Sequence, residues 1–170
     1  MGGRPPVLNK AMLDAMNEQI KQEFSSAYHY LAMLAHCEAV NLPGFAHWLR
    51  LQSQEEASHA LKYFDFVQDR GGRGALKVIE QPPAELNSPL EVFQQVLDQE
   101  RKVTGMIHQL YELAVKENDD ASQACLQWFI TEQIEEEKQA SRIVEQLKMI
   151  GEAPAGLLML DRQLAARSDG

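Results

Sequence analysis

The sequence is poor in cysteine and in positive charge, and it has no long apolar run. Its 170 residues include 2 cysteines, Cys37 and Cys125, which lack the close spacing of a zinc or redox pair. We therefore expect two buried thiols in a reducing compartment, with the cytoplasm as the location. No run of about 18 apolar residues is present, and residues 1–8 carry one arginine and two prolines. This composition predicts no membrane span and no export leader.

The shortage of basic residues also limits the partners of the protein. Lysine and arginine number 16 against 25 aspartate and glutamate residues, a net charge of −9 at pH 7. Phosphate groups require a basic face or tail, so nucleic acid is an unsuitable partner and cations are suitable ones. With 45% hydrophobic residues, a chain of this length can bury one core, and we expect one domain over residues 1–170.

Apolar residues recur at intervals of three and four along four long stretches, which is the period of an amphipathic helix. Asn9 suits an N-cap, Pro43 follows the first stretch, and Ser88 with Pro89 suits the start of the third. Glycines after residue 70 and at Gly151 end the second and fourth stretches. We predict helices at about 9–39, 43–70, 89–118 and 120–150, and a short fifth helix at about 157–166.

The connections between these helices predict how the helices pack. Short turns join the first helix to the second and the third to the fourth, so the helices of each pair are antiparallel. Roughly 18 residues separate the second helix from the third, and such a segment can extend to ~60 Å, more than the ~40 Å length of a helix. These lengths predict an all-α four-helix bundle with one long crossover and a short fifth helix at the C-terminus.

Each of the four apolar faces is interrupted near its middle by residues that can bind metal ions. In the second helix a glutamate and a histidine stand three residues apart, which places both on one face. A bundle built on these faces would gather four carboxylates and one imidazole in its core. The interruptions, helix by helix, are Glu23, then Glu56 with His59, then Glu100, then Gln133 with Glu136.

These buried carboxylates need a counter-charge. Each ionised carboxylate in a dry core costs several kcal/mol, and no lysine or arginine interrupts the apolar faces. Two divalent ions would balance four carboxylates, and His59 would add a neutral nitrogen ligand. Oxygen-rich ligation with one imidazole suits iron or manganese, and we favour iron because a pair of irons can pass two electrons to dioxygen. The alternative is a set of buried polar residues that only fixes the register of the bundle.

Other residues beside these positions extend the hypothesis. Tyr30 lies two turns after Glu23, so its hydroxyl could donate to a ligand carboxylate, although an ordinary core tyrosine fits the same position. Glu55, Glu132 and Glu135 adjoin the expected ligands but lie off the apolar faces. A third cation site and a solvated acidic surface both fit this placement.

On these positions the chain resembles the bacterial non-haem ferritins over nearly its whole length. Ferritin-like di-iron bundles take a Glu from each of two helices and Glu-x-x-His from each of the other two. Glu23, Glu100 and the pair Glu56 and His59 match three of these contributions. The fourth helix departs, because it offers Gln and Glu where the symmetric pattern has Glu and His, and non-haem ferritins share this asymmetry.

The resemblance implies a ferroxidase centre in which one iron is held by Glu23, Glu56 and His59. It implies a second iron that shares Glu56. A third iron would lie beside the centre. The aromatic residues Tyr30 and Trp128 match residues that lie near the centre in such proteins. The implied ligands are Glu56, Glu100 and Glu136 with Gln133 close by for the second iron, and Glu55, Glu132, Glu135 and Glu136 for the third.

The resemblance also implies the state of assembly and the activity. Subunits would form a shell of 24, in which Fe(II) is oxidised by dioxygen or hydrogen peroxide and stored as ferric mineral. Bacterioferritins carry a haem-ligand methionine where this chain has Ala57, so we expect no haem. Two alternatives stay open: a rubrerythrin-like di-iron peroxidase, which would need a rubredoxin-type domain with paired cysteines, and a catalytically quiet shell subunit.

Overall fold

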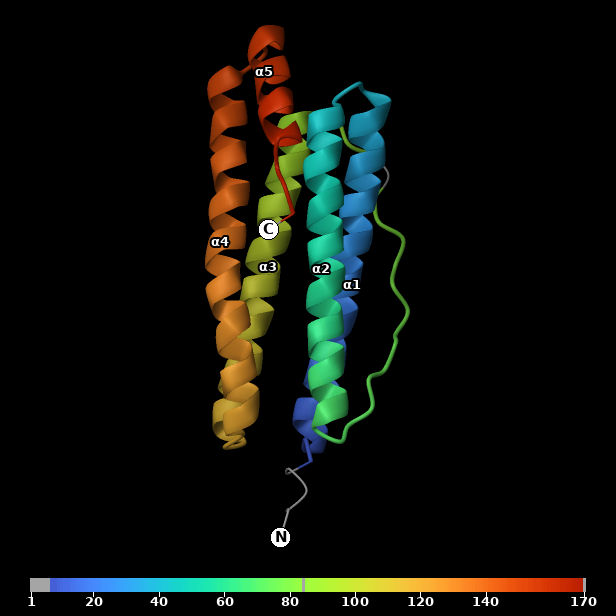
Figure 1. Ribbon diagram of the computed structural model, residues 1–170, viewed down its shortest axis with the longest axis vertical. Helices are drawn as coiled ribbons and strands as arrows, with labels where there is room; N and C mark the ends of the chain where they lie inside the picture. The colour runs from blue at the N-terminus through green and yellow to red at the C-terminus, as the bar shows by residue number, and fades with distance from the viewer. Residues whose placement is uncertain (1–6, 84, 170) are drawn as a thin grey trace.

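The structure is a computed structural model that describes residues 7–83 and 85–169. Four long helices form a bundle and a short fifth helix lies at one end of it (Figure 1). Residues 1–6, which hold most of the segment in which we expected no leader, lie outside the described part. Over the described residues, no helix is long and apolar enough to cross a bilayer. The helices are α1 (Lys10–Ala39), α2 (Pro43–Asp69), α3 (Pro89–Lys116), α4 (Asp120–Ile150) and α5 (Pro154–Ala165).

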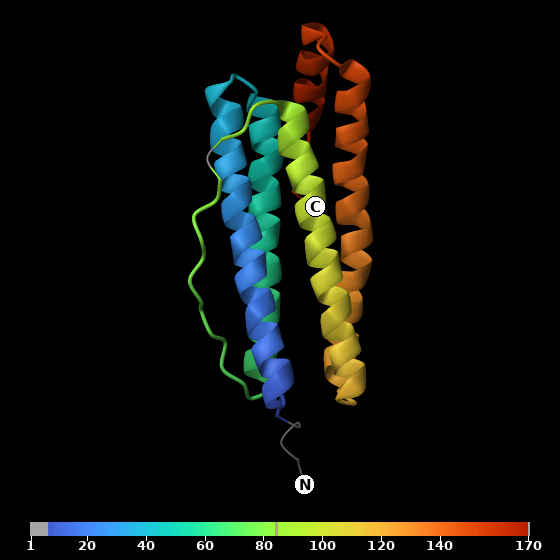
Figure 2. The ribbon, with the colours of Figure 1, turned by 180° about the vertical axis from the view of Figure 1, so that it is seen from behind.

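The bundle consists of two helical hairpins, α1 with α2 and α3 with α4. The segment between α2 and α3 runs along the bundle beside α1, from one end to the other (Figures 1 and 2). Asn17 of α1 holds this crossover, because its Nδ2 donates to the Arg73 carbonyl at 3.3 Å and its Oδ1 accepts from the Ala75 amide at 2.8 Å. The predicted four-helix bundle with one long crossover and a fifth helix is confirmed.

Side-chain caps begin three of the helices. Asn9 and Ser88 accept hydrogen bonds from backbone amides three residues later, at 2.8 Å and 3.1 Å. The predicted start of the fifth helix at residue 157 is wrong, because α5 begins at Pro154. A proline fits the first helical position, where a backbone N–H has no partner within the helix. The third helix ends at Lys116, two residues early, and Asn118 adopts a left-handed φ of 52° in the turn that follows.

The apolar core is divided into two clusters by a polar layer. One cluster, toward α5, includes Tyr30, Phe45 and Phe93, and the other includes Met16 and Ile107. Each long helix passes through one cluster, then the layer, then the other cluster. Burial of each large apolar side chain contributes about 1.5–3 kcal/mol, which offsets the cost of burying the layer. The polar layer consists of Glu23, Gln52, Glu56, His59, Glu100, Gln133 and Glu136, each at most 5% exposed.

Candidate metal centre

The structure brings the predicted ligands of all four long helices together in the polar layer. Glu23, Glu56 and His59 form one group, in which one ligand atom from each residue lies within 4.8 Å of the others. Glu56, Glu100 and Glu136 form a second group within the same limit. We call these groups the first and second inner sites. Glu56 belongs to both, so one carboxylate could bridge two cations.

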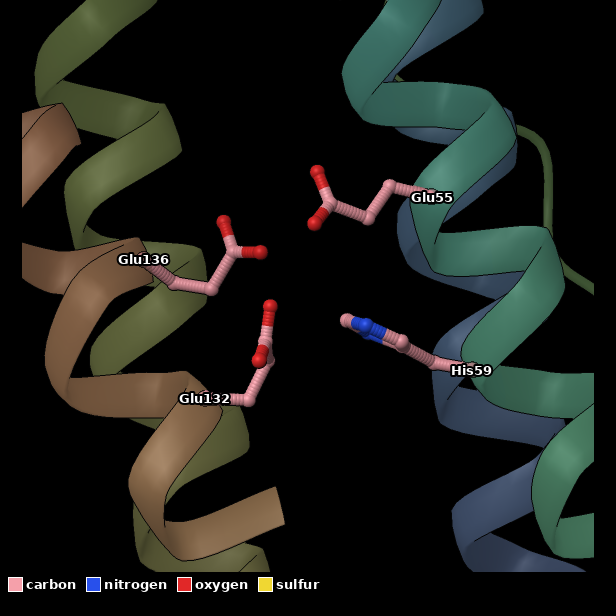
Figure 3. Close-up of side chains that lie close together, drawn as sticks. All are labelled: Glu55, His59, Glu132 and Glu136. Carbon is pink, nitrogen blue, oxygen red and sulfur yellow. The ribbon is translucent and has the colours of Figure 1, made fainter. Parts of the chain in front are cut away.

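A third group lies on the flank of the bundle, between α2 and α4. Figure 3 shows Glu55 and His59 of α2 facing Glu132 and Glu136 of α4. One ligand atom from each of these four residues lies within 4.8 Å of the others, and we call the group the flank site. His59 belongs to it, although the sequence assigned His59 to the first inner site alone. Glu135 lies outside the group, half exposed, with Lys138 Nζ 3.6 Å from its Oε2.

Neutral donors bind oxygens of the inner carboxylates. Gln133 Nε2 donates to Glu100 Oε2 at 3.2 Å, and the Tyr30 hydroxyl donates to Glu100 Oε1. Gln19 Nε2 donates to Glu23 Oε1 at 2.8 Å. Amide and hydroxyl donors are uncharged, so they orient a carboxylate without taking the place of a cation. Hydrogen-bond partners of metal ligands usually have this role.

Gln52 is a second amide of this kind that bridges two helices. Its Nε2 donates to Glu136 Oε2 at 2.6 Å and to Glu56 Oε1 at 3.3 Å. Sequence reasoning gave no role to Gln52 or Gln19. The available signal was their spacing, since each glutamine lies four residues before a glutamate of the same apolar face.

Two carboxylate oxygens in the centre lack a donor. Among the described residues, Glu23 Oε2 and Glu56 Oε2 are buried without a hydrogen-bond partner. His59 Nδ1 lies 3.7 Å from Glu56 Oε2, beyond hydrogen-bond range. Buried polar atoms are nearly always paired, so these oxygens indicate a missing partner, and a cation fits the chemistry of the donor set.

The carboxyl groups of the centre hold protons tightly when no cation is present. Burial, followed by repulsion from Glu100 and Glu23, raises the pKa of Glu56 well above its ordinary value. Burial and the charges of Glu100 and Glu55 raise the pKa of Glu136 to about 9. Burial raises the pKa of Glu100 to about 7 against the opposing hydrogen bonds from Tyr30 and Gln133. Cation binding therefore releases protons from this centre.

An open pocket of about 870 Å³ connects the flank site with the surface. Glu55, His59 and Glu132 line it, together with both tryptophans, Trp48 and Trp128. Trp128 lies edge-on to His59 with 5.6 Å between ring centroids, which places it beside the centre as the resemblance implied. The pocket gives ions a route to the polar layer.

A four-helix bundle whose helices all direct carboxylates into a buried centre, with one carboxylate shared by two ligand groups, is typical of the class of carboxylate-ligated dinuclear metal proteins. The family model of the ferritin-like domain, Ferritin, matches residues 13–150. The chain belongs to the ferritin family, and iron storage is the function of that family.

Individual relatives match along nearly their whole length. A bacterial non-heme ferritin of Staphylococcus saprophyticus is 40% identical over 162 residues, which is 95% of this chain and 97% of the relative. A bacterial non-heme ferritin of Bacteroides fragilis is 38% identical over 161 residues, 95% of this chain and 100% of the relative. The crystal structure of an open-pore ferritin from Archaeoglobus fulgidus is 46% identical, with a TM-score of 0.94, and the match covers 95% of this chain and 99% of that one. The resemblance to bacterial non-haem ferritins is confirmed.

Proposed function

We propose that this protein is a ferroxidase that oxidises Fe(II) in its polar layer and stores the product as Fe(III). The observation that supports the proposal most is the position of Glu56. This carboxylate belongs to both inner sites, and its Oε2 has no donor among the described residues. A shared carboxylate holds two cations close enough together for one oxidant to reach both.

In this proposal two Fe(II) ions are the substrate. The first would bind Glu23, Glu56 and His59. The second would bind Glu56, Glu100 and Glu136, with Gln133 beside it. Each Fe(II) gives up one electron, and dioxygen or hydrogen peroxide accepts the two electrons with protons. These side chains are the ligands that we propose, and Tyr30 orients Glu100 through its hydrogen bond.

The work of the protein in this reaction is to place ligands and to manage protons. Gln52, Gln133 and Tyr30 would fix the orientation of the ligand carboxylates by donating hydrogen bonds to Glu136 and Glu100. Glu100 and Glu136 release protons when a cation binds, because burial raises the pKa of both carboxyl groups. The two apolar clusters cover the layer at both ends of the bundle, and the hydrogen bonds within the layer orient the carboxylates.

The flank site would take a third iron ion. Glu55, His59, Glu132 and Glu136 supply its ligands, and the pocket supplies its access. Glu135, which the resemblance also assigns to this iron, would have to turn from Lys138 to reach it. Since Glu136 and His59 are each shared with an inner site, ions could pass between the flank site and the layer without leaving their ligands.

We also propose a 24-subunit shell around the stored iron, a single domain over residues 1–170, a cytoplasmic location and no bound haem. Large apolar side chains on α4 and α5, those of Met149, Leu158 and Met159, are exposed in the isolated subunit. Contiguous exposed apolar surface is typical of a contact between chains. Assembly would cover it.

The test is aerobic addition of Fe(II) to metal-free protein, with ferric absorbance followed by stopped flow. We expect a fast phase that saturates near two irons per chain, followed by slower uptake of iron that stays with the protein. Glu56→Gln and His59→Ala should abolish the fast phase and leave assembly intact. Glu112→Gln is the matched control, since it removes an exposed carboxylate outside the centre.

Other outcomes would favour the alternatives. Peroxide reduction that retains no iron would indicate a rubrerythrin-like peroxidase. Iron uptake with no fast phase would indicate a catalytically quiet shell subunit. Normal fast oxidation in Glu56→Gln would contradict the proposed centre.

A further inference from the structure

An arginine from the C-terminal segment reaches back to the flank site. Arg167 follows α5, and its Nη2 donates to Glu55 Oε2 at 2.8 Å. Its Nη1 donates to Gln52 Oε1 at 3.0 Å and to the Trp48 carbonyl at 3.2 Å. The guanidinium also lies over the Trp48 ring, 4.6 Å from the centroid. One guanidinium therefore binds the flank-site carboxylate of Glu55 and also the amide of Gln52, which donates to the inner-site carboxylates of Glu56 and Glu136.

Contacts between the start of α2 and the segment that carries Arg167 fix the position of its main chain. His47 Nε2 donates to the Arg167 carbonyl at 2.7 Å. Within α5, Asp161 Oδ1 accepts from the Phe45 amide at 3.0 Å. Gly44 allows this contact, because a Cβ there would lie 1.7 Å from the Asp161 carbonyl oxygen. The start of α2 thus holds α5 and the segment behind it in one place.

Arg167 brings a positive charge to a place that a metal ion also needs. The flank site contains three carboxylates, and Glu55 is the one whose oxygen the guanidinium holds. A divalent ion bound to Glu55 would stand beside the guanidinium, where like charges repel by amounts that matter in a partly buried site. The two cations therefore compete for one carboxylate.

The same arginine is connected to the inner sites through Gln52. Because Gln52 Oε1 accepts from Arg167, its Nε2 is turned toward Glu56 and Glu136. None of the three hydrogen bonds that the Arg167 guanidinium donates reaches an inner-site carboxylate, and its charge acts on Glu136 without such a bond. Repulsion by Arg167 should thus weaken cation binding at the flank site more than at the inner sites.

We propose that Arg167 is the internal counter-ion of the flank site and that a third metal ion must displace it from Glu55. This inference rests on the proposed function, because it sets the order in which the same centre fills. The inner sites fill first and the flank site last. Displacement moves the guanidinium and not the main chain, because His47 still holds the Arg167 carbonyl, and the pocket that the Arg167 side chain lines becomes wider beside Glu55.

The experiment is calorimetric titration of the assembled, metal-free protein with Zn²⁺, which binds carboxylate and imidazole ligands without redox chemistry. Wild type should show two tight sites per chain and a weaker third. Arg167→Gln should tighten the third site by about tenfold, within the usual range for coupled binding events, and change the first two by less, because Arg167 contacts the inner ligands only through Gln52. Arg162→Gln is the matched control, because it removes the same charge from an exposed position on α5 and should behave as wild type.

Trp48 gives a second readout. In a Trp128→Phe background, Trp48 is the remaining tryptophan of the chain, and departure of the guanidinium from its ring should change its fluorescence. We expect the change to follow the third equivalent of Zn²⁺. The change at the third equivalent should disappear when Arg167→Gln is added to this background.

Two results would overturn the inference while leaving the proposed function intact. One is a third site of unchanged affinity in Arg167→Gln together with a lower melting temperature, which would mean that Arg167 only anchors the C-terminal segment. The other is a weaker third site in that variant, which would mean that Arg167 assists binding. A wild-type protein with no tight Zn²⁺ site would contradict the proposed centre itself, and the inference with it.

Discussion

The side-chain amide of Gln52 on α2 donates a hydrogen bond of 2.6 Å to the carboxylate of Glu136 on α4. The donor and the acceptor belong to different hairpins of the bundle. The same nitrogen donates to Glu56, and the amide oxygen accepts from Arg167, so contacts on both sides set the orientation of the amide. One uncharged side chain thus positions a ligand of each hairpin.

Substitution of this glutamine should weaken the centre without unfolding the bundle. In Gln52→Ala the pKa of Glu136 should rise further, because the hydrogen bond from Gln52 lowers it at present. Protons would then compete better with cations, and we expect Zn²⁺ affinity at the second inner site to fall by roughly 10- to 100-fold. Calorimetry measures this. Gln94→Ala on the exposed face of α3 is the control, and equal affinity in the two variants would contradict the role of Gln52.

The hydroxyl of Tyr30 should affect iron oxidation in a pH-dependent way. Its hydrogen bond lowers the pKa of Glu100, which burial raises to about 7. In Tyr30→Phe that pKa rises, so Glu100 keeps its proton to higher pH and excludes Fe(II). At pH 6 we expect the fast phase to slow by about tenfold, since a hydrogen bond to a charged group contributes ~1.5 kcal/mol or more. The loss should vanish at high pH.

Stopped-flow rates measured from pH 5.5 to 8.5 check this expectation. Tyr28→Phe, at an exposed position of the same helix, is the matched control. An equal loss at every pH would show that Tyr30 acts by another route than through the proton of Glu100.

The stability of the metal-free protein should decrease as pH rises. The carboxyl groups of Glu100 and Glu136 have folded-state pKa values of about 7 and about 9, above the ordinary 4.5. Between pH 4.5 and 9 the folded state therefore binds more protons than the unfolded state, and the free energy of unfolding falls with pH. For each group, the free energy of unfolding should fall by on the order of 1 kcal/mol per pH unit between its ordinary pKa and its folded-state pKa.

Denaturant unfolding at pH 5, 7 and 9 measures this loss. Glu136→Gln should reduce the decrease between pH 7 and 9, the remainder coming from Glu56, whose pKa is also raised, and Glu112→Gln should leave the decrease unchanged. Saturating Zn²⁺ should reverse the trend, because metal binding requires the deprotonated carboxylates. A metal-free protein that gains stability from pH 5 to pH 9 would contradict the raised pKa values.

A methyl group at Gly44 should loosen α5. Its Cβ would lie 1.7 Å from the main-chain oxygen of Asp161, and backbone cannot move aside as a flexible side chain does. We expect Gly44→Ala to destabilise the protein by about 1–3 kcal/mol. Gly105→Ala is the control, because no atom lies within 4 Å of its added Cβ and alanine favours a helix interior by roughly 0.5–1 kcal/mol. Thermal unfolding should move the two melting temperatures in opposite directions.

The arrangement of the long helices follows from local signals. Apolar period, capping residues such as Asn9 and Ser88, and the length of the crossover predict the bundle because each acts within a few residues. The gathering of Glu23, Glu56 and Glu100 was also predictable, because a buried carboxylate on an apolar face has to meet the other faces in the core.

The remainder of the site depends on contacts between distant segments. Arg167 meets Glu55 across 112 positions of the chain, and nothing near either residue in the sequence indicates the other. The direction in which Glu135 points is set by Lys138 and by its place on α4. The start of α5 at Pro154 reflects an ambiguity, since proline both ends one helix and begins another.

The division of the apolar core into two clusters gives the subunit a middle layer of buried polar side chains from all four long helices. At that height the hairpin of α1 and α2 meets the hairpin of α3 and α4 mainly through carboxylates, amides and one imidazole. Cations bound there would act as cross-links between the two hairpins. An iron-loaded subunit should therefore be more rigid at its middle than a metal-free one, because the bound iron ions would link the two hairpins.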